Sequence, residues 1–596
     1  MTYYQQAAID APPLTQLQAN LNQFRVLVQT QKSATALQLL PTIQTQLNLP
    51  VSRATLYARI NLSRSLMQLA RQDASELDTE AIAAVLTPAI QQAQSLGDRR
   101  TEAYALGSLG SLYEQTQQWT AAKSLTEQAL FMAQAVNATD IAYQWQWQLG
   151  RVLKAENNRE EAIAAYQAAF ETLQALRNDL LAVSSTLQFS FRESIEPVYR
   201  EYVELLLRRS TSGSSHSETT QANLKQARQV IESLQLAELN NYFRTACLEG
   251  QTVTLDQINQ TNAAVIYPII LDDRLEIILS LPQQPLQQYT VNVPRSQVDT
   301  TLNQLRQNLE KPFTTMQGKQ LGKRVYDWMI HPLEPALQAQ SITTLTFVLD
   351  GSLRNVPMAA LYNGNQYLIE QYSVALTPGL QLFNPQKLKR DRLQVLLAGL
   401  TEKREGFSAL TYVEQELQDI QAEVPSRVLL NEAFTSVALQ EQIERSAVSI
   451  VHLATHGQFS SDAQKTFILA WDKPVTVDEL GTLLRTTDET RPQPIELLVL
   501  SACETAAGDD RAALGLAGVA VQAGARSTLA SLWSLNDQSA ARLIRQFYRE
   551  LLNPDLSKPD ISKTEALRQA QLTLLRDPDY RHPLYWAPYV LIGNWL

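Results

Sequence analysis

The chain has little cysteine and histidine for its length. Its 596 residues include only seven such side chains, which are Cys247, Cys503, His216, His331, His452, His456 and His582. Two cysteines are too few for the disulfide scaffold of a small secreted protein, and the spacings exclude zinc ribbons and zinc fingers. We therefore expect a protein of a reducing compartment, with no metal ion and no cofactor.

Basic charge and long apolar segments are also scarce. Lys and Arg number 50 against 60 Asp and Glu, so the formal net charge is −10. Nucleic acids and anionic membranes attract basic surfaces, so neither is an expected partner. No stretch of about 18 apolar residues occurs, and the first residues, MTYYQQAAIDAPPLTQ, lack the regions of an export signal. The expected location is the cytoplasm.

The remaining composition is that of a folded protein with several domains. Hydrophobic residues make up 45% of the chain and charged residues 18%. At roughly 100–200 residues per domain, one domain is not enough. Changes in composition and residue pattern along the chain predict helical repeats at 1–208, a Ser/Thr-rich linker at 209–221, a connecting helix at 222–249 and an α/β domain at 250–596.

The first 200 residues show an internal repeat. Leu109-Gly110 recurs as Leu149-Gly150, and Ala89, Ala129 and Ala169 fall in one column, so the period is 40 residues. Apolar residues at helical spacing fill the intervals between these positions. The pattern predicts pairs of antiparallel helices, with the small residues where two helices approach closely.

Polar pairs mark the expected turns of these helix pairs, at Gln117-Gln118 and Asn157-Asn158. The stretches LGSLYEQTQQWTAAKSLTEQAL and LGRVLKAENNREEAIAAYQAAF resemble tetratricopeptide repeats of the longer-period kind, over about residues 60–180. Residues 11–60 show the pattern poorly and are expected to be a degenerate first repeat or a cap. A generic antiparallel helical array is the alternative, and either arrangement predicts binding of a protein partner.

Beyond residue 250, short β-branched runs alternate with helical patterns. The runs LQVLLAG, VSIVHLA and IELLVLSA are uninterrupted, as in strands buried on both faces of a parallel sheet. The predicted strands are Ala264–Pro268, Arg274–Ser280, Thr344–Leu349, Val374–Leu376, Leu393–Ala398, Val448–Leu453, Phe467–Ala470, Ile495–Leu500, Ser527–Leu532 and Tyr589–Ile592. The predicted crossover helices are Tyr412–Glu423, Val477–Leu484, Leu514–Ala523, Asp537–Leu552 and Lys563–Leu575. The first two strands are expected to form an antiparallel hairpin at the edge of the sheet.

Two predicted strand ends carry reactive side chains. His456-Gly457 follows the strand Val448–Leu453, and Cys503 follows the strand Ile495–Leu500. Ligands of open α/β sheets bind at the carboxyl ends of the strands. If the two strands are parallel neighbours about 4.8 Å apart, the imidazole and the thiol come within reach of each other.

A Cys–His dyad of this kind suits acyl transfer. The thiolate is the nucleophile, and an adjacent imidazole either stabilises it or takes the proton of the thiol and later protonates the leaving amine. Gly457 allows a backbone N–H to approach the developing oxyanion, and the N–H of Cys503 can supply a second donor. The alternative is that Cys503 and His456 are ordinary core residues, which is the common fate of either residue alone.

Metal and dinucleotide sites are not expected from the other motifs. His452 and His456 form an H-x-x-x-H pair, but VSIV before them predicts a strand, which would place the two rings about 13 Å apart. Gly515 and Gly518 in GLAGVAVQAGA lack the strand that precedes a dinucleotide-binding loop, so helix–sheet packing explains them.

The motifs of residues 250–596 resemble the CHAT family (caspase-HetF associated with tetratricopeptide repeats), a branch of the caspase-like and separase-like cysteine peptidases. The stretches that carry the resemblance are GSLRNVPMAAL, VHLATHGQF, LVLSACETAAGD, GLAGVAVQAGARSTLASLWSLND and HPLYWAPYVLIGNWL. The resemblance implies a caspase-like α/β domain with a mostly parallel central sheet. It also implies a dyad of His456 and Cys503, with the amides of Gly457 and Cys503 at the oxyanion site.

The resemblance to separase-like relatives also suggests a substrate preference. In those relatives an acidic residue beyond the strand after the catalytic Cys receives a basic side chain, and Asp537 in SLWSLND stands in a similar position. Equally, Asn536 or Asp537 could be the N-cap of the helix Asp537–Leu552. Glu504 and Asp462 are further candidates for substrate contacts.

Together these features predict a cysteine endopeptidase that cleaves a protein or peptide substrate after a basic residue, with repeats that bind or gate a partner protein. The alternative function is a non-catalytic interaction scaffold in which the CHAT domain is structural or regulatory.

Overall fold

A computed structural model of the chain describes residues 4, 6, 9, 11–72, 79–183, 191–208, 217–243, 262–379, 387–388, 393–445, 448–460, 465–484, 495–501, 504–505, 519, 524–534, 536–552 and 561–596. The chain divides into two compact units, Met1–Leu205 and Leu206–Leu596. No described helix is long and apolar enough to cross a membrane.

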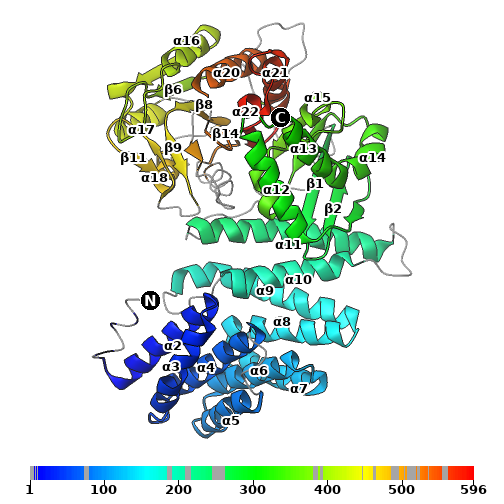
Figure 1. The fold of residues 1–596 in the computed structure, drawn as a ribbon, viewed down its shortest axis with the longest axis vertical. Coiled ribbons are helices and arrows are strands. Elements are labelled where there is room, and N and C mark those ends of the chain that lie inside the picture. The colour runs from blue at the N-terminus through cyan, green and yellow to red at the C-terminus, as the bar shows by residue number, and fades with distance from the viewer. Residues whose placement is uncertain are drawn as a thin grey trace. The chain divides into compact units, whose positions relative to one another are not determined.

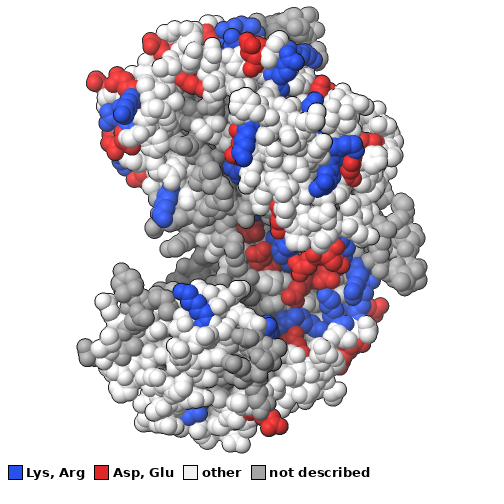
Figure 2. Space-filling model, in the orientation of Figure 1, with Lys and Arg blue, Asp and Glu red and all other residues white. Residues whose placement is uncertain are grey.

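The first unit is built from helices (Figure 1). They are α2 (Pro13–Gln29), α3 (Ser33–Gln46), α4 (Arg53–Gln72), α5 (Thr79–Ser95), α6 (Arg99–Gln115), α7 (Trp119–Ala135), α8 (Thr139–Ala155) and α9 (Arg159–Val183), followed by α10 (Glu196–Leu207). Consecutive helices from α4 to α9 pack against each other, so they form stacked antiparallel pairs. Helix α2 packs against α3 and α4, in the segment where the repeat pattern is weak. Few charged side chains lie over helices α2 to α5 on the face shown in Figure 2.

The turns and the close helix contacts follow the 40-residue period. Gln117 and Asn157 both have left-handed backbones, with φ of 59° and 60°, and each ends a helix at a predicted turn. A Cβ added at Gly110 would lie 2.8 Å from the Gln148 side chain, and one at Gly150 would lie 2.7 Å from the ring of Tyr166. Glycine is therefore favoured where these helices approach, most strongly at Gly150, which meets a buried ring. The predicted repeat array is confirmed.

The second unit contains a sheet of eleven strands. In spatial order they are β3 (Gln287–Val291), β2 (Leu275–Ser280), β1 (Ala263–Ile270), β4 (Thr344–Phe347), β5 (Ser373–Leu376), β15 (Tyr589–Gly593), β14 (Ser527–Ser531), β12 (Leu497–Ser501), β8 (Ile450–Ala454), β6 (Val395–Gly399) and β7 (Ser426–Leu430). A smaller sheet has the order β11 (Pro474–Thr476), β10 (Phe467–Leu469), β9 (Gly457–Phe459) and β13 (Glu504–Thr505).

Most neighbouring strands of the large sheet are parallel, as predicted. Only the pairs β1–β2, β2–β3 and β14–β15 are antiparallel. The predicted hairpin of β1 and β2 is confirmed, but its place at the sheet edge is wrong. The half-exposed strand β3 pairs with β2 and forms the edge, and β1 pairs with β4 on its other side. A polar, half-exposed strand lacks the apolar pattern that marked the buried strands, so the sequence analysis missed it.

Helices connect and cover the strands (Figure 1). They are α11 (Glu218–Phe243), α12 (Arg295–Leu309), α13 (Thr315–Met329), α14 (Glu334–Ala339), α15 (Leu368–Gln371), α16 (Val413–Glu423), α17 (Ser436–Arg445), α18 (Val477–Leu484), α20 (Asp537–Leu551), α21 (Lys563–Arg576) and α22 (Pro583–Trp586). Four of the five predicted crossover helices appear here, and the fifth, Leu514–Ala523, lies outside the described residues except for Val519.

Helix α11 begins four residues earlier than expected, inside the range 209–221 assigned to a linker. The Ser217 hydroxyl accepts the N–H of Thr220 at 3.2 Å, and the Ser217 carbonyl accepts the N–H of Gln221 at 3.0 Å. A serine in this position satisfies the free amides of a first helical turn, so the Ser/Thr run itself starts the helix. Cys247, expected on the connecting helix, lies outside the described residues.

The topology creates a switch point between β6 and β8. From β6 the chain passes through α16 to β7, which is the edge strand of the sheet. From β7 it passes through α17 to β8, which lies on the other side of β6, toward the centre of the sheet. Right-handed crossovers in opposite directions place α16 and α17 on opposite faces of the sheet. Loops that leave β6 and β8 at their carboxyl ends therefore diverge at a place where α/β sheets bind ligands.

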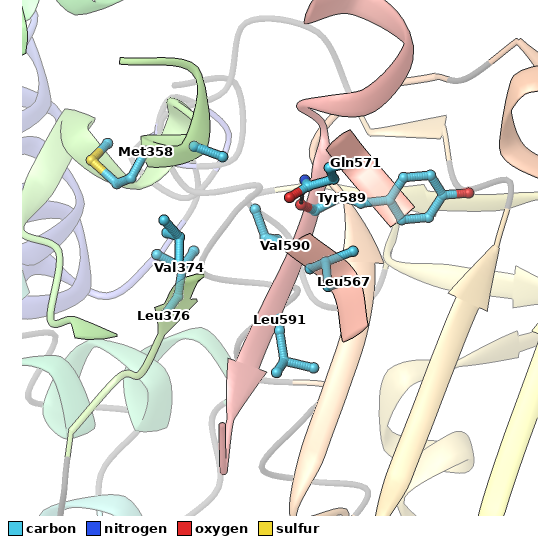
Figure 3. Close-up of a pocket in the computed structure, with 9 residues that line it drawn as sticks. Met358, Val374, Leu376, Leu567, Gln571, Tyr589, Val590 and Leu591 are labelled. Atoms are coloured by element: carbon cyan, nitrogen blue, oxygen red, sulfur yellow. Dashed lines mark hydrogen bonds between the residues drawn. The ribbon is translucent and has the colours of Figure 1, made fainter. Parts of the chain in front are cut away.

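Strands β5 and β15 join the two blocks of the sheet with a single residue pair, Leu376 with Ile592. A cavity of about 10 Å³ remains beside this joint (Figure 3), lined by Met358, Ala359, Val374, Leu376, Leu567, Gln571, Tyr589, Val590 and Leu591. Such a space holds at most one water molecule, so it is a packing defect and no substrate site.

Candidate active site

His456 lies at the carboxyl end of β8, where the chain passes from the large sheet into the small one. Strand β8 ends at Ala454 and β9 begins at Gly457. Between them, the buried Thr455 donates its N–H to the Ser501 carbonyl at 3.3 Å and its hydroxyl to the Leu469 carbonyl at 2.6 Å. The backbone before His456 is therefore fixed to both sheets.

The loop after β6 orients the imidazole of His456. Its Nε2 lies 2.7 Å from the Ser408 carbonyl, and its ring stacks on Phe407 with centroids 4.8 Å apart. A carbonyl oxygen only accepts hydrogen bonds, so Nε2 carries a proton. In the neutral ring Nδ1 is then the nitrogen with a free lone pair, which is the state that a general base requires. The residue is 9% exposed.

This loop, residues 401–412, is itself held in shape. Its tip is a tight turn, in which the Phe407 N–H donates to the Arg404 carbonyl at 2.7 Å and Glu405 and Gly406 have φ of 47° and 86°. Two consecutive left-handed residues are typical of a type I′ turn. The Arg404 guanidinium lies 4.0 Å from the ring centre of Trp471, a cation–π contact that ties the loop to the chain after β10.

Cys503 and Asp462 lie outside the described residues, and of Glu504 only the backbone, in β13, is described. The residues on both sides of 502–503 are placed, however. Ser501, at the end of β12, pairs with Ala454, and Glu504 pairs in parallel with Gln458. These two pairs enclose the segment that contains His456 and Gly457. Gly457 itself lies in β9 opposite Ile468.

Asp537 is the first residue of α20, but its carboxylate serves another helix. It accepts the N–H of Tyr412 at 2.8 Å, at the start of α16, and the hydroxyl of Thr411 lies 3.4 Å away. Asn536 is the N-cap of α20, because its side chain accepts the N–H of Ser539 at 3.0 Å. Burial raises the pKa of the Asp537 carboxyl above its usual value, against the opposing effect of the Tyr412 N–H.

Asp537 and His456 therefore contact the same loop, His456 through Phe407 and Ser408 and Asp537 through Thr411 and Tyr412. Both side chains thus border the loop that leaves β6, at the switch point of the sheet.

His452, the histidine within β8, has a structural environment. Its Nε2 lies 2.9 Å from a carboxylate oxygen of Glu416 on α16, and its Nδ1 lies 3.3 Å from the hydroxyl of Tyr548 on α20. All three side chains are buried. The network joins the strand that carries His456 to the two helices that border the site. Within the described ranges, no three His, Cys, Asp or Glu side chains are arranged to hold a metal ion.

Sequence reasoning missed Phe407, Ser408 and Glu416. The stretch TEKREGFSALTY carries no reactive motif, and Ser408 acts through its backbone, which any residue provides. The usable signal was topological, because a loop at the carboxyl end of a strand next to β8 must border His456.

Comparison with known proteins assigns part of the chain to a family. Residues 319–594 match the CHAT domain model, whereas the resemblance read from the motifs was drawn from residue 250. Human tetratricopeptide repeat protein 28 is 22% identical over 330 residues, which is 46% of this chain and 13% of the relative.

Solved structures give partial matches. A crystal structure of the separase–securin complex of Saccharomyces cerevisiae matches 98% of this chain and 54% of that chain, with 11% identity and a TM-score of 0.43. The Arg-specific cysteine proteinase gingipain R matches 50% of this chain and 74% of that chain, with 9% identity and a TM-score of 0.31. The chain thus spans about half the length of the separase chain and a small part of the curated relative. The motif resemblance is confirmed by the family match: residues 319–594 match the CHAT domain model, and a helical repeat array precedes them in this chain.

Proposed function

We propose that this chain is a cysteine endopeptidase whose dyad is Cys503, the nucleophile, and His456, the general base and acid. We further propose that it cleaves after a basic residue and that the helical repeats bind or gate a protein partner.

The observation that carries the dyad is the strand register on both sides of Cys503. Ser501 pairs with Ala454 and Glu504 pairs with Gln458, so the described residues on both sides of positions 502 and 503 lie beside those on both sides of His456. Neighbouring strands lie about 4.8 Å apart. Because two residues span only about 7 Å, a thiol at position 503 has little freedom to move away from the imidazole of His456.

The tautomer of His456 supports its role. Nε2 donates to the Ser408 carbonyl, so Nδ1 is available to take the proton of the Cys503 thiol. The thiolate attacks the carbonyl carbon of the peptide bond, and the imidazolium returns the proton to the leaving amine as the C–N bond breaks. A water molecule then hydrolyses the thioester, losing a proton to His456, and the thiol is restored.

The oxyanion of each tetrahedral intermediate needs backbone donors. We assign this role to the N–H groups of Gly457 and Cys503, because Gly457 begins β9 directly after His456 and has no side chain to block an approaching carbonyl. In this proposal one donor follows β8 and the other follows β12, the strand that pairs with β8.

Asp537 is the proposed receptor for the basic side chain of the substrate, with Glu504 and Asp462 as further pocket candidates. Its carboxylate is partly buried, and the pKa is raised because burial disfavours the charge. A Lys or Arg side chain would compensate that charge. The Tyr412 and Thr411 contacts involve a single carboxylate oxygen, Oδ2, and a bound cation can share the carboxylate with them.

The dyad is tested with Cys503→Ala and His456→Ala in the full chain, with Cys247→Ala as the matched control. Cleavage of a fluorogenic peptide library, and alkylation by iodoacetamide followed by mass spectrometry, are the measurements. We expect loss of turnover in the first two variants and preferential alkylation of Cys503 in the wild type. Turnover retained by Cys503→Ala would refute the nucleophile. Absent turnover with equal alkylation of both cysteines would favour the non-catalytic scaffold.

The pocket is tested with Asp537→Asn on peptides that end in Arg, Lys or Asp before the cleaved bond. We expect kcat/KM for the Arg and Lys peptides to fall by about 10- to 100-fold, as for the loss of a hydrogen-bonded charge pair. Asp419→Asn, at the exposed ion pair with Arg545 on the neighbouring helices α16 and α20, is the control and should change little. Preference of the wild type for Asp, or an equal loss on all peptides, would exclude this pocket.

A further inference from the structure

The repeat array contains an apolar groove between helices α7 and α9, with α8 as its floor. Its volume is about 310 Å³. The apolar lining consists of Leu130 from α7, Leu149 and Leu153 from α8, and Ala164, Ala165 and Ala168 from α9.

The groove exists because one repeat lacks a large side chain that the previous repeat has. With a 40-residue period, Ala165 corresponds to Leu125, and Leu130 corresponds to Ile90. Leu125 and Ile90 both pack against the core of the preceding repeats. An alanine at position 165 leaves the corresponding space unfilled, and burying apolar surface there would be favourable.

The rim of the groove is acidic. Glu127 and Glu161 are exposed at the lining and form no ion pair within the part of the chain that the structure describes. The one basic lining residue, Lys123, is 3.5 Å from Glu156 and is neutralised by it. Phe131, one helical turn from Glu127, is 73% exposed beside this rim. An apolar floor with unbalanced negative charge at its margin complements an apolar segment with basic flanks.

We propose that this groove binds an amphipathic helix of a partner protein, whose large apolar side chains fill the space above Ala164, Ala165 and Ala168 and whose Lys or Arg residues face Glu127 and Glu161. A helix suits the site because both walls are helices that a third can pack against, ridges into grooves. The inference specifies the partner-binding part of the proposed function and does not depend on peptidase activity.

The test measures fluorescence anisotropy of a labelled amphipathic helical peptide, with Leu and Phe on one face and Lys on its flanks, against the full chain carrying Cys503→Ala. The same peptide with every Lys replaced by Glu is the charge control. We expect binding of the Lys peptide that weakens with added salt, and at least tenfold weaker binding of the Glu peptide.

Ala165→Leu restores the side chain of the preceding repeat and should raise the Kd of the Lys peptide by about tenfold or more, while Ala84→Leu, at an exposed position of α5, should leave it unchanged. Far-ultraviolet circular dichroism confirms that each variant is folded. Glu127→Gln combined with Glu161→Gln should abolish the salt dependence. No binding of the Lys peptide, equal binding of the Glu peptide, or an unchanged Kd in Ala165→Leu would each overturn the proposal, whatever the outcome for Cys503.

Discussion

Lys563 is a basic side chain with no exposed surface. Its ammonium nitrogen lies 2.9 Å from the Ser527 hydroxyl and 3.4 Å from the Asn594 carbonyl, so it joins the start of α21 to β14 and to the end of β15. Burial lowers the pKa of Lys563 from 10.5 to about 7, because the charged form loses its hydration. Neither hydrogen-bond partner is a carboxylate; the charge of Glu496 opposes the lowering of the pKa, and that of Arg526 adds to it.

This lysine predicts a pH dependence of stability. Between pH 7 and 10.5 Lys563 is protonated in the unfolded chain but not in the folded chain. The contribution of Lys563 to the free energy of unfolding therefore rises with pH, by at most about 1.4 kcal/mol per pH unit. The expected contribution is constant below pH 7. Urea denaturation at several pH values, followed by tryptophan fluorescence, measures it.

Lys563→Met keeps an apolar side chain of similar length and removes the titrating group. The difference in free energy of unfolding between wild type and variant, plotted against pH, therefore reports the contribution of Lys563 alone. Lys323→Met, at a half-exposed lysine of α13 paired with Asp327, is the control and should retain the wild-type slope. A Lys563→Met variant with the full wild-type slope would show that another group titrates.

Single residues also mark the limit of what sequence can predict. The sequence allows two roles for Asp537, as a helix N-cap or as part of a substrate pocket. In the structure the N-cap of α20 is Asn536. The observed partner of Asp537, the Tyr412 N–H, lies 125 residues away in the chain. Local patterns carry no information on such a contact, because it depends on how α16 and α20 pack together.

At the scale of elements, the ten predicted strands all exist because each is an apolar run buried on at least one face. Among the described residues, the five strands that were not predicted are short or polar, and β9 and β13 have only three and two residues. Strands β9, β11 and β13 depend on their neighbours in the small sheet, since such short segments carry no intrinsic strand signal, whereas β3 and β7 are the edge strands of the large sheet. The register of β9 with β13 nevertheless pairs Glu504 with Gln458, two residues after His456.

The repeats were easier to predict because their contacts are local. Residues separated by 40 positions lie next to each other in the structure: Arg64 donates to the Tyr104 hydroxyl at 2.8 Å and to the Gln144 amide oxygen at 3.0 Å. Most contacts of a helix pair are with the pairs next to it in the chain, so a sequence period maps directly onto structure. In the sequence, the groove at Ala165 is indicated only by the change from a leucine to an alanine at the same position of consecutive repeats. A single repeat would not reveal that change.

On the scale of the second unit, helix α11 connects strand β1 and the chain after β4 of the large sheet with the small sheet. Its Glu232 accepts the Tyr267 hydroxyl of β1 at 2.7 Å, its Gln235 donates to the Leu349 carbonyl at 3.0 Å, and its Tyr242 donates to the Ser460 carbonyl at 2.7 Å. Ser460 directly follows β9, the strand that begins beside His456. One helix therefore holds both the first block of the sheet and the loop beyond the candidate dyad.

This arrangement predicts that Tyr242→Phe loosens the small sheet without unfolding the unit. The ring stays in the core, where Tyr242 is 7% exposed, and only the hydroxyl that reaches Ser460 and Thr466 is lost. Losing one such hydrogen bond costs about 0.5–1.5 kcal/mol, so amides of β9 and β10 should exchange hydrogen about 2- to 10-fold faster when exchange follows local opening. Mass spectrometry of peptides that cover residues 450–470 measures this exchange.

Tyr289→Phe, which removes a hydroxyl from edge strand β3, is the control and should leave the exchange rate of those peptides unchanged. Because the Tyr242 hydroxyl bonds to Ser460, directly after β9, an unchanged exchange rate in Tyr242→Phe, or a uniform increase over the whole unit, would show that this side chain does not hold the small sheet independently of the core.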